Sequence, residues 1–357
     1  HLAMAFANVM WGAGTSTSAR GGTWRMEIRP LQTITRLGLF DCDLSPDGAA
    51  VAAVYQEEEG QHLGVWSVTG CNWLLDLALA GPYARPRFGP LGRRLAAARE
   101  RERLTVWSLD EGKVLFDMER GRGDEITAHA FGPGERTVAI AQGDRVGIWG
   151  VEDGAWQATL AMPGEIHAME SSPDGRLLGV GLAAGGAVVV DLEAQDVIAT
   201  LPQIAQPVST LAFHPMQAWL LTATEPSFRM TGHRRERTAH GWAQVWNYRT
   251  GEEVVRIPCD YQAALLGKGH YLATLTDNSR SLWVWQVPEA ALVAHIENVV
   301  PNVVVDERGF EGRQVTLSAT PRGDLLAVSG LVRPISPVGV LRIYAFSTEA
   351  VPEPQAI

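Results

Sequence analysis

Two pairs of charged residues stand at matching positions near the N-terminus. Asp41 and Asp43 precede a turn proline by five and three residues, and Arg85 and Arg87 precede the next such proline in the same way. Carboxylate and guanidinium groups at equivalent positions can pair with each other, or can act together on a ligand as acid, base or charge clamp. Because buried charges are rarely left unpaired, we expect ion pairs, with Glu170 at a further equivalent position.

A basic segment, PSFRMTGHRRERTAH at 226–240, is the second chemically distinctive feature. Its four arginines and one glutamate give a net charge of +3 in a chain of −10. Arginine with interleaved aromatic and methionine residues is typical of protein interfaces, and long loops of compact folds are often functional. A solvated hairpin tip would have a similar composition, so both interpretations stay open. The residues considered for partner binding are Phe228, Arg229, Met230, His233, Arg234, Arg235, Arg237 and His240.

The composition and the absence of known motifs exclude several classes of protein. Hydrophobic residues make up 46% and charged residues 20% of the 357 positions, which is typical of a globular protein. The net charge of −10 argues against general nucleic-acid binding, and three cysteines cannot form a disulfide framework. No nucleophile elbow, P-loop, HExxH or CxxC motif occurs. We therefore expect no enzyme activity, no cofactor and no metal ion.

Short β-branched segments that end in an aromatic residue recur along the chain. The successive spacings between their centres are 41, 42, 41, 56, 39 and 59 residues. A period of about 40–45 residues is typical of the four-stranded blades of a propeller, and the two long intervals contain the same unit with an insertion. The centres are Trp66, Trp107, Trp149, Val190, Trp246, Trp285 and Tyr344.

Turns that contain proline and glycine run in phase with these segments. SPDG occurs at 45–48 and again at 172–175, and related turns stand at most of the equivalent places. Proline fixes φ and glycine allows positive φ, so these turns join antiparallel strands. The second and third strands of each unit are continuously apolar, which is typical of sheets packed on both faces.

The combination of an apolar strand, a Pro-Asp-Gly turn and a strand that ends in Val-Trp resembles the WD40 repeat family over residues 30–347. The resemblance implies an all-β, single seven-bladed β-propeller with four antiparallel strands in each blade, and a role as a scaffold for protein interactions. No repeat ends in Trp-Asp, and none carries a Gly-His pair before its first strand. We therefore expect the buried Asp–His–Ser/Thr–Trp network of that family to be missing or replaced.

The seventh unit lacks an outer strand, whereas the segment PLQTI at 30–34 stands alone before the first unit. We predict that 30–34 completes blade seven and closes the ring, because closure removes open sheet edges. The propeller would then span 23–347, with 1–22 as a flexible arm or tag remnant and 348–357 as a C-terminal tail. The expected blades are 38–77, 84–118, 126–160, 166–201, 208–257, 263–296 and 315–347 with 30–34.

Three histidines, His129, His167 and His214, lie on or beside the expected innermost strands of successive blades. Three such side chains could hold a metal ion. His129, however, occupies a position that is filled by apolar residues or cysteine in other blades. We therefore expect it to be a core side chain and predict no metal site.

Three segments inserted into the repeat define the expected binding face. In a propeller, the loops between the second and third strands share one face with the loops that join successive blades. Segments 226–240, 297–314 and 331–339 are of these two kinds and fall in blades five to seven. Arg308, Phe310 and Arg333 from the last two segments complete the predicted binding residues.

The favoured hypothesis is a non-enzymatic scaffold, monomeric outside its complex, that binds an acidic protein or peptide through this face. The alternative is a propeller enzyme or small-molecule binder at the mouth of the central channel. Nucleic-acid binding would need a broader basic face than one loop provides. No apolar run reaches the about 20 residues that a membrane span needs, so we expect a soluble, cytoplasmic protein. The Ala/Gly/Arg-rich composition is typical of a GC-rich bacterial source.

Overall fold

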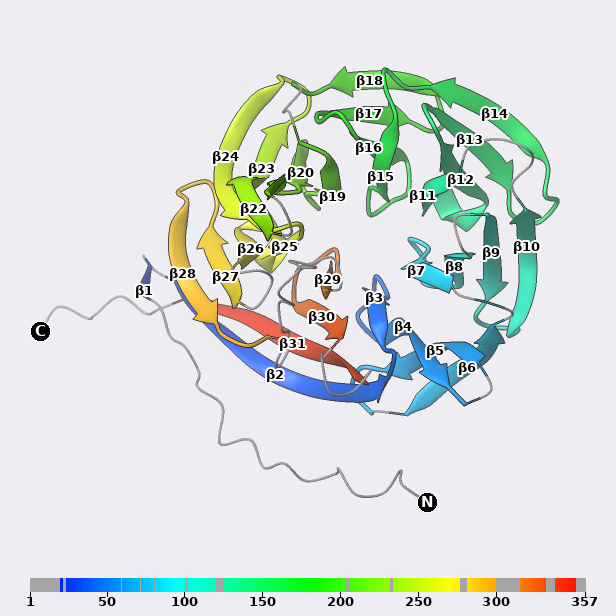
Figure 1. The fold of residues 1–357 in the computed structure, drawn as a ribbon, viewed down its shortest axis with the longest axis horizontal. Coiled ribbons are helices and arrows are strands. Elements are labelled where there is room, and N and C mark those ends of the chain that lie inside the picture. Colours follow the sequence, from blue (N-terminus) through cyan, green and yellow to red (C-terminus); the bar gives the residue numbers. More distant parts are fainter. Residues whose placement is uncertain are drawn as a thin grey trace, which may run out of the picture.

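The fold is a ring of seven β-sheets around a central axis (Figure 1). The computed structural model describes residues 20–21, 24–58, 60–70, 72–79, 81, 83–99, 102–119, 125–202, 206–231, 234–276, 281–299, 315–331 and 338–350. Each blade contains four antiparallel strands, here called a to d from the axis outward. This confirms the predicted all-β, seven-bladed propeller. Within the described residues, no helix has the length and hydropathy that crossing a membrane requires.

The strands follow the predicted order a, b, c, d in every blade. Blade one is β3 (Phe40–Leu44), β4 (Ala50–Glu57), β5 (Gly60–Ser67) and β6 (Trp73–Leu79). Blade two is β7 (Tyr83–Phe88), β8 (Arg94–Arg99), β9 (Arg103–Ser108) and β10 (Lys113–Glu119). Blade three is β11 (Ile126–Phe131), β12 (Thr137–Gln142), β13 (Arg145–Gly150) and β14 (Trp156–Ala161). Blade four is β15 (Ile166–Ser171), β16 (Leu177–Leu182), β17 (Ala187–Asp191) and β18 (Asp196–Thr200).

The remaining blades carry the irregularities. Blade five is β19 (Val208–Phe213), β20 (Trp219–Thr224), β23 (Gly241–Asn247) and β24 (Glu252–Cys259), with the hairpin β21 (Ser227–Thr231) and β22 (Arg234–Ala239) inserted between b and c. Blade six is β25 (Ala263–Leu266), β26 (Tyr271–Thr276), β27 (Ser281–Gln286) and β28 (Ala291–Ile296). Blade seven is β29 (Val315–Ala319), β30 (Leu325–Leu331), β31 (Val338–Ala350) and β2 (Trp24–Leu37). Two short 3₁₀ turns, η1 (Pro133–Glu135) and η2 (Gly267–Gly269), join a to b in blades three and six.

The N-terminal strand β2 closes the ring by pairing with the C-terminal strand β31 along its whole length. The prediction of closure is confirmed, but the strand is longer than the expected 30–34. Met26, Ile28 and Ile34 are buried, which anchors both halves of β2 in the core. The two-residue strand β1 (Arg20–Gly21) pairs with the start of β2, and β31 extends three residues past the expected end of the propeller.

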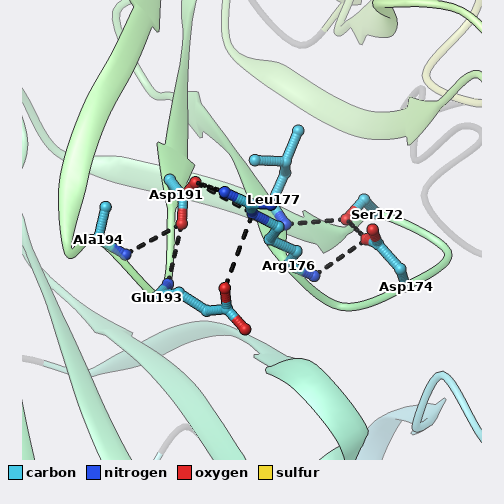
Figure 2. A network of polar contacts seen from close by, with 7 residues as sticks. All are labelled: Ser172, Asp174, Arg176, Leu177, Asp191, Glu193 and Ala194. Carbon is cyan, nitrogen blue, oxygen red and sulfur yellow. Dashed lines mark hydrogen bonds and ion pairs between the residues drawn. The ribbon is translucent and has the colours of Figure 1, made fainter.

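The Ser-Pro-Asp-Gly turns are held by side-chain hydrogen bonds, as Figure 2 shows for blade four. Ser172 Oγ donates to Asp174 Oδ1 at 2.5 Å and accepts from the amide of Leu177 at 2.8 Å. Ser45 and Asp47 repeat the first of these contacts in blade one. Serine and aspartate favour such turns because their side chains satisfy the backbone groups locally.

Apolar side chains fill the space between adjacent blades. Between blades two and three, Ala96 and Val106 pack with Phe131, Val138 and Ile140 in one buried cluster. Both faces of the b and c strands are buried in this way, which explains their continuously apolar sequences. The packing around the ring holds the inner strands in place and so positions the side chains of the channel.

Direct bonds between tryptophan and threonine connect strands b and c in two blades. Trp246 Nε1 donates to Thr222 Oγ1 at 3.1 Å in blade five, and Trp285 Nε1 donates to Thr274 Oγ1 at 3.0 Å in blade six. Each bond gives a large indole ring a polar partner inside the apolar layer.

Candidate functional site

The innermost strands enclose a central cavity of about 330 Å³. All five charged residues that were predicted to form ion pairs line this cavity: Asp41, Asp43, Arg85, Arg87 and Glu170. They come from strands a of blades one, two and four. The channel is therefore polar, whereas the layers between the blades are apolar.

The two aspartates of blade one hold strand a of blade two in place. Asp43 Oδ2 accepts a hydrogen bond from the amide of Phe88 at 2.8 Å, and Asp41 Oδ2 accepts from the amide of Arg85 at 2.7 Å. The Arg85 guanidinium donates to the carbonyl of Thr127 in blade three. These carboxylates act as bridges between blades, because their acceptor oxygens satisfy backbone donors of the neighbouring strand.

Arg87 lies between carboxylates of two different blades. Its Nη1 is 3.8 Å from Asp43 Oδ1, and its Nε is 3.9 Å from Glu170 Oε2. Both separations exceed hydrogen-bonding distance, so the attraction is electrostatic, and water bridges polar groups at such separations in wet sites. The structure thus brings Asp43, Arg87 and Glu170 together across the channel, from blades one, two and four.

Burial changes the proton affinity of the channel carboxyl groups. It raises the pKa of Glu170 to about 7, with Arg87 opposing the rise and Asp43 adding to it. Burial also raises the pKa of Asp43, against the lowering effects of Arg87 and of the Phe88 amide. A carboxyl group that titrates near neutral pH can exchange a proton with a ligand, which is a property of binding and catalytic sites.

The three histidines occupy separate environments. His129 is buried at 3% exposure, and burial together with the nearby Arg87 lowers its pKa to about 3. His167 Nε2 lies 3.2 Å from Glu225 Oε1. His214 Nδ1 accepts from the amides of the turn that follows it, and burial lowers its pKa to about 4. Among the described residues, no group of three or more His, Cys, Asp or Glu side chains is arranged to hold a metal ion.

Two hydroxyl residues of blade seven complete the polar network of the channel. Ser318 Oγ donates to Asp43 Oδ1 at 2.7 Å, and Thr316 Oγ1 donates to Asp41 Oδ1 at 3.1 Å. They were not among the residues predicted from the sequence, although they stand three and five residues before the turn proline of blade seven. The same spacing from the turn proline that identifies the charged residues therefore also identifies these two hydroxyl residues.

The inserted hairpin is the largest described departure from the repeat. Strands β21 and β22 form a separate two-stranded sheet between strands b and c of blade five. The b-to-c loops lie on the same face of the ring as the loops between blades, and we call this the b–c face. Arg229 is exposed on β21, with Glu236 as its cross-strand neighbour in the register.

Contacts with both neighbouring interblade loops fix the base of the hairpin. Gln206 Nε2, in the loop that enters blade five, donates to the carbonyl of His240 at 2.9 Å. Arg237 Nη1 lies 3.1 Å from Asp260 Oδ1, in the loop that leaves the blade, and 3.2 Å from His240 Nδ1. Arg237 therefore has a structural contact besides the binding role that the sequence suggested.

The other predicted binding residues are described in part. Phe228, Met230, Arg234 and Arg235 have defined backbone positions in the hairpin. His233, Arg308, Phe310 and Arg333 lie outside the described residues, as do most of segments 297–314 and 331–339. On the b–c face, the structure therefore describes mainly the hairpin and the residues that anchor its base.

Ring, strand order and turns define the class of the chain as a seven-bladed β-propeller. No family model matches the sequence. Among solved structures, the chain is similar to the β-propeller domain of Cps50 (Swd1) from Myceliophteria thermophila, with a TM-score of 0.66 and 14% sequence identity. The alignment covers 89% of this chain and 99% of that domain. At this identity the likeness concerns the fold.

Proposed function

We propose that the chain is a non-enzymatic, cytoplasmic interaction scaffold that binds a partner protein through its b–c face. The observation that carries the proposal is the hairpin of blade five, which adds a basic, anchored surface between strands b and c of that blade. Propellers of this type commonly act as interaction scaffolds, which supports the proposal by analogy. The strands that flank segments 297–314 and 331–339 end on the same face in the adjacent blades, so we include these segments in the proposed surface.

The test is capture of the native partner by the monomeric wild-type protein and by a variant in which 226–240 is replaced with a short Gly-Ser turn. We expect the replacement to abolish capture while the ring stays folded, because the hairpin lies outside the blade cores. Arg229→Ala should slow capture and weaken its salt dependence, since rim charges act mainly on association rate. Arg249→Ala is the matched control, because Arg249 is an exposed arginine on the opposite face of the same blade. Undiminished capture by the loopless protein would contradict the proposal.

The channel supports a second candidate function, the binding of a small ligand. The cavity of about 330 Å³ contains Glu170, whose pKa of about 7 allows proton exchange with a bound molecule. A thermal-shift screen of small metabolites would test this candidate. A ligand of the channel should raise the melting temperature of the wild type more than that of Glu170→Gln.

A further inference from the structure

The inserted hairpin has free strand edges. Strands β21 and β22 pair only with each other, and no other strand in the described part of the chain extends their sheet. The outward N–H and C=O groups of an edge strand form a template for another extended chain. The hairpin therefore offers main-chain hydrogen bonds in addition to its charge.

The two edges are not equivalent. In β22, Thr238 has no cross-strand partner, because Ser227 pairs with Ala239 and Phe228 pairs with Arg237. A bulge of this kind, together with several arginines, is a device that protects an edge from pairing. Strand β21 pairs residue for residue from Phe228 to Thr231 and carries a single charged residue. The edge of β21 is thus the one suited to strand addition.

The hairpin is held in position before any partner arrives. Gln206 anchors its base on the side of blade four, donating to the His240 carbonyl at 2.9 Å and to Ser227 Oγ at 3.5 Å. The Arg237–Asp260 ion pair anchors it on the side of blade six. A preformed edge lowers the entropic cost of binding, because the ordering of the strand has already taken place.

The charge of the hairpin determines which kind of peptide it attracts. Segment 226–240 carries +3, so the rest of the chain carries −10 − 3 = −13. An acidic peptide is therefore attracted to the hairpin and repelled elsewhere. Exposed Arg229 is the charged residue of β21, and successive residues of a strand face opposite sides.

We propose that the edge of β21 binds an extended peptide of alternating acidic and apolar residues as a third strand. The acidic side chains of the peptide lie on the face of the sheet that carries Arg229, and its apolar side chains lie on the opposite face. This inference rests on the proposed function, since it names the partner class and the mode of recognition at the same hairpin.

The experiment measures binding of a fluorescent peptide of alternating Glu and Val residues to the full chain by fluorescence anisotropy. Two further peptides carry backbone N-methyl groups, one on every Glu and one on every Val. Only alternate backbone groups of an added strand face the edge, so one methylated peptide should lose at least about tenfold in affinity while the other binds like the parent. Equal binding by all three peptides would mean attraction by charge alone and would overturn strand addition.

Protein variants locate the site. Arg229→Ala should weaken binding of the parent peptide several-fold and Arg249→Ala should not, while the Gly-Ser replacement of 226–240 should abolish binding. No binding by the wild type would overturn the inference, yet the proposed function would survive if capture of the native partner still required the hairpin. Sedimentation at the same protein concentrations tests whether a second copy of this chain occupies the edge of β21 instead of a peptide. A dimer that the Gly-Ser replacement dissociates would assign the edge to a second copy and overturn the inference.

Discussion

Arg237 and Asp260 join the inserted hairpin to the loop that leads into blade six. The Arg237 Nη1 atom lies 3.1 Å from Asp260 Oδ1, and Nη2 donates to Oδ2 at 3.3 Å. The side chain of Asp260 is 4% exposed, whereas that of Arg237 is 23% exposed. A buried carboxylate depends on its partner more than a partly hydrated guanidinium does. Removing the arginine should therefore destabilise the fold more than removing the carboxylate.

Removal of Arg237 should therefore cost more stability than removal of the charge on Asp260. We expect Arg237→Ala to lower the free energy of unfolding by about 2 kcal/mol, because Asp260 stays buried without this partner. Asp260→Asn should cost about 1 kcal/mol or less, since water can hydrate the arginine. Urea unfolding measures both, and hydrogen exchange of the hairpin amides shows whether the loss is local. Equal losses in the two variants would contradict the asymmetry.

Closure by β2 should dominate the thermal stability of the ring. Deletion of residues 1–37 removes the outer strand of blade seven and three buried apolar side chains, those of Met26, Ile28 and Ile34. At about 1.5–3 kcal/mol for each buried side chain, the melting temperature should fall by at least about 10 °C. Deletion of residues 1–19 is the matched control. If both truncated proteins melted at the wild-type temperature, β2 would not be the closing strand.

The architecture was predictable because each blade is specified locally. Strand partners lie within one blade or the next, so a period of about 40–45 residues and the turn chemistry determine the order of the strands. Val190 illustrates this, since it holds the place of the aromatic residue in β17 and the unit still forms a regular blade. Ring closure was predictable for a similar reason, because the missing outer strand and the unpaired segment complement each other.

The contacts of the channel and of the hairpin were predictable only in part. Matching positions before the turn prolines identified Asp43, Arg87 and Glu170, but the period does not show that Arg87 reaches blade four. The ion pair of Arg237 with Asp260 depends on how the hairpin folds over the adjacent loop, which no spacing encodes. Side-chain reach across blades is a property of the tertiary structure.

Ser318 should be a stronger structural residue of the channel than Thr316. The Ser318 hydroxyl donates to Asp43 and also accepts from the amide of Leu44 at 2.9 Å. Ser318→Ala would leave that buried N–H without its acceptor, at an expected cost of about 1–3 kcal/mol in the free energy of unfolding. The Thr316 hydroxyl donates to Asp41, so Thr316→Val should cost less. Chemical denaturation of both variants provides the comparison, and a larger loss for Thr316→Val would refute this ranking.

Glu170 should make the stability of the propeller depend on pH near neutrality. Its pKa rises from an ordinary value of 4.5 to about 7 in the folded chain, mainly because the channel walls partly desolvate the carboxyl group, whose side chain is 36% exposed. Between these two pH values the folded state binds more protons than the unfolded state. The stability gained from this proton is complete below pH 4.5 and is lost as the pH rises through 7. Burial also raises the pKa of Asp43, so its proton adds to the stability that is lost as the pH rises.

Glu170→Gln should flatten this decline, because glutamine keeps the neutral form at every pH. We expect the urea midpoint of the variant to change less than that of the wild type from pH 4.5 to 8, and the variant to be at least as stable as the wild type at pH 8. Arg87 retains Asp43 as a partner in the variant, so this arginine keeps one of its two ion pairs. Glu252→Gln removes an exposed carboxylate on β24 and serves as the control, with a pH profile that follows the wild type. If the Glu170→Gln and wild-type profiles ran parallel over this range, the proton on Glu170 would not be linked to folding.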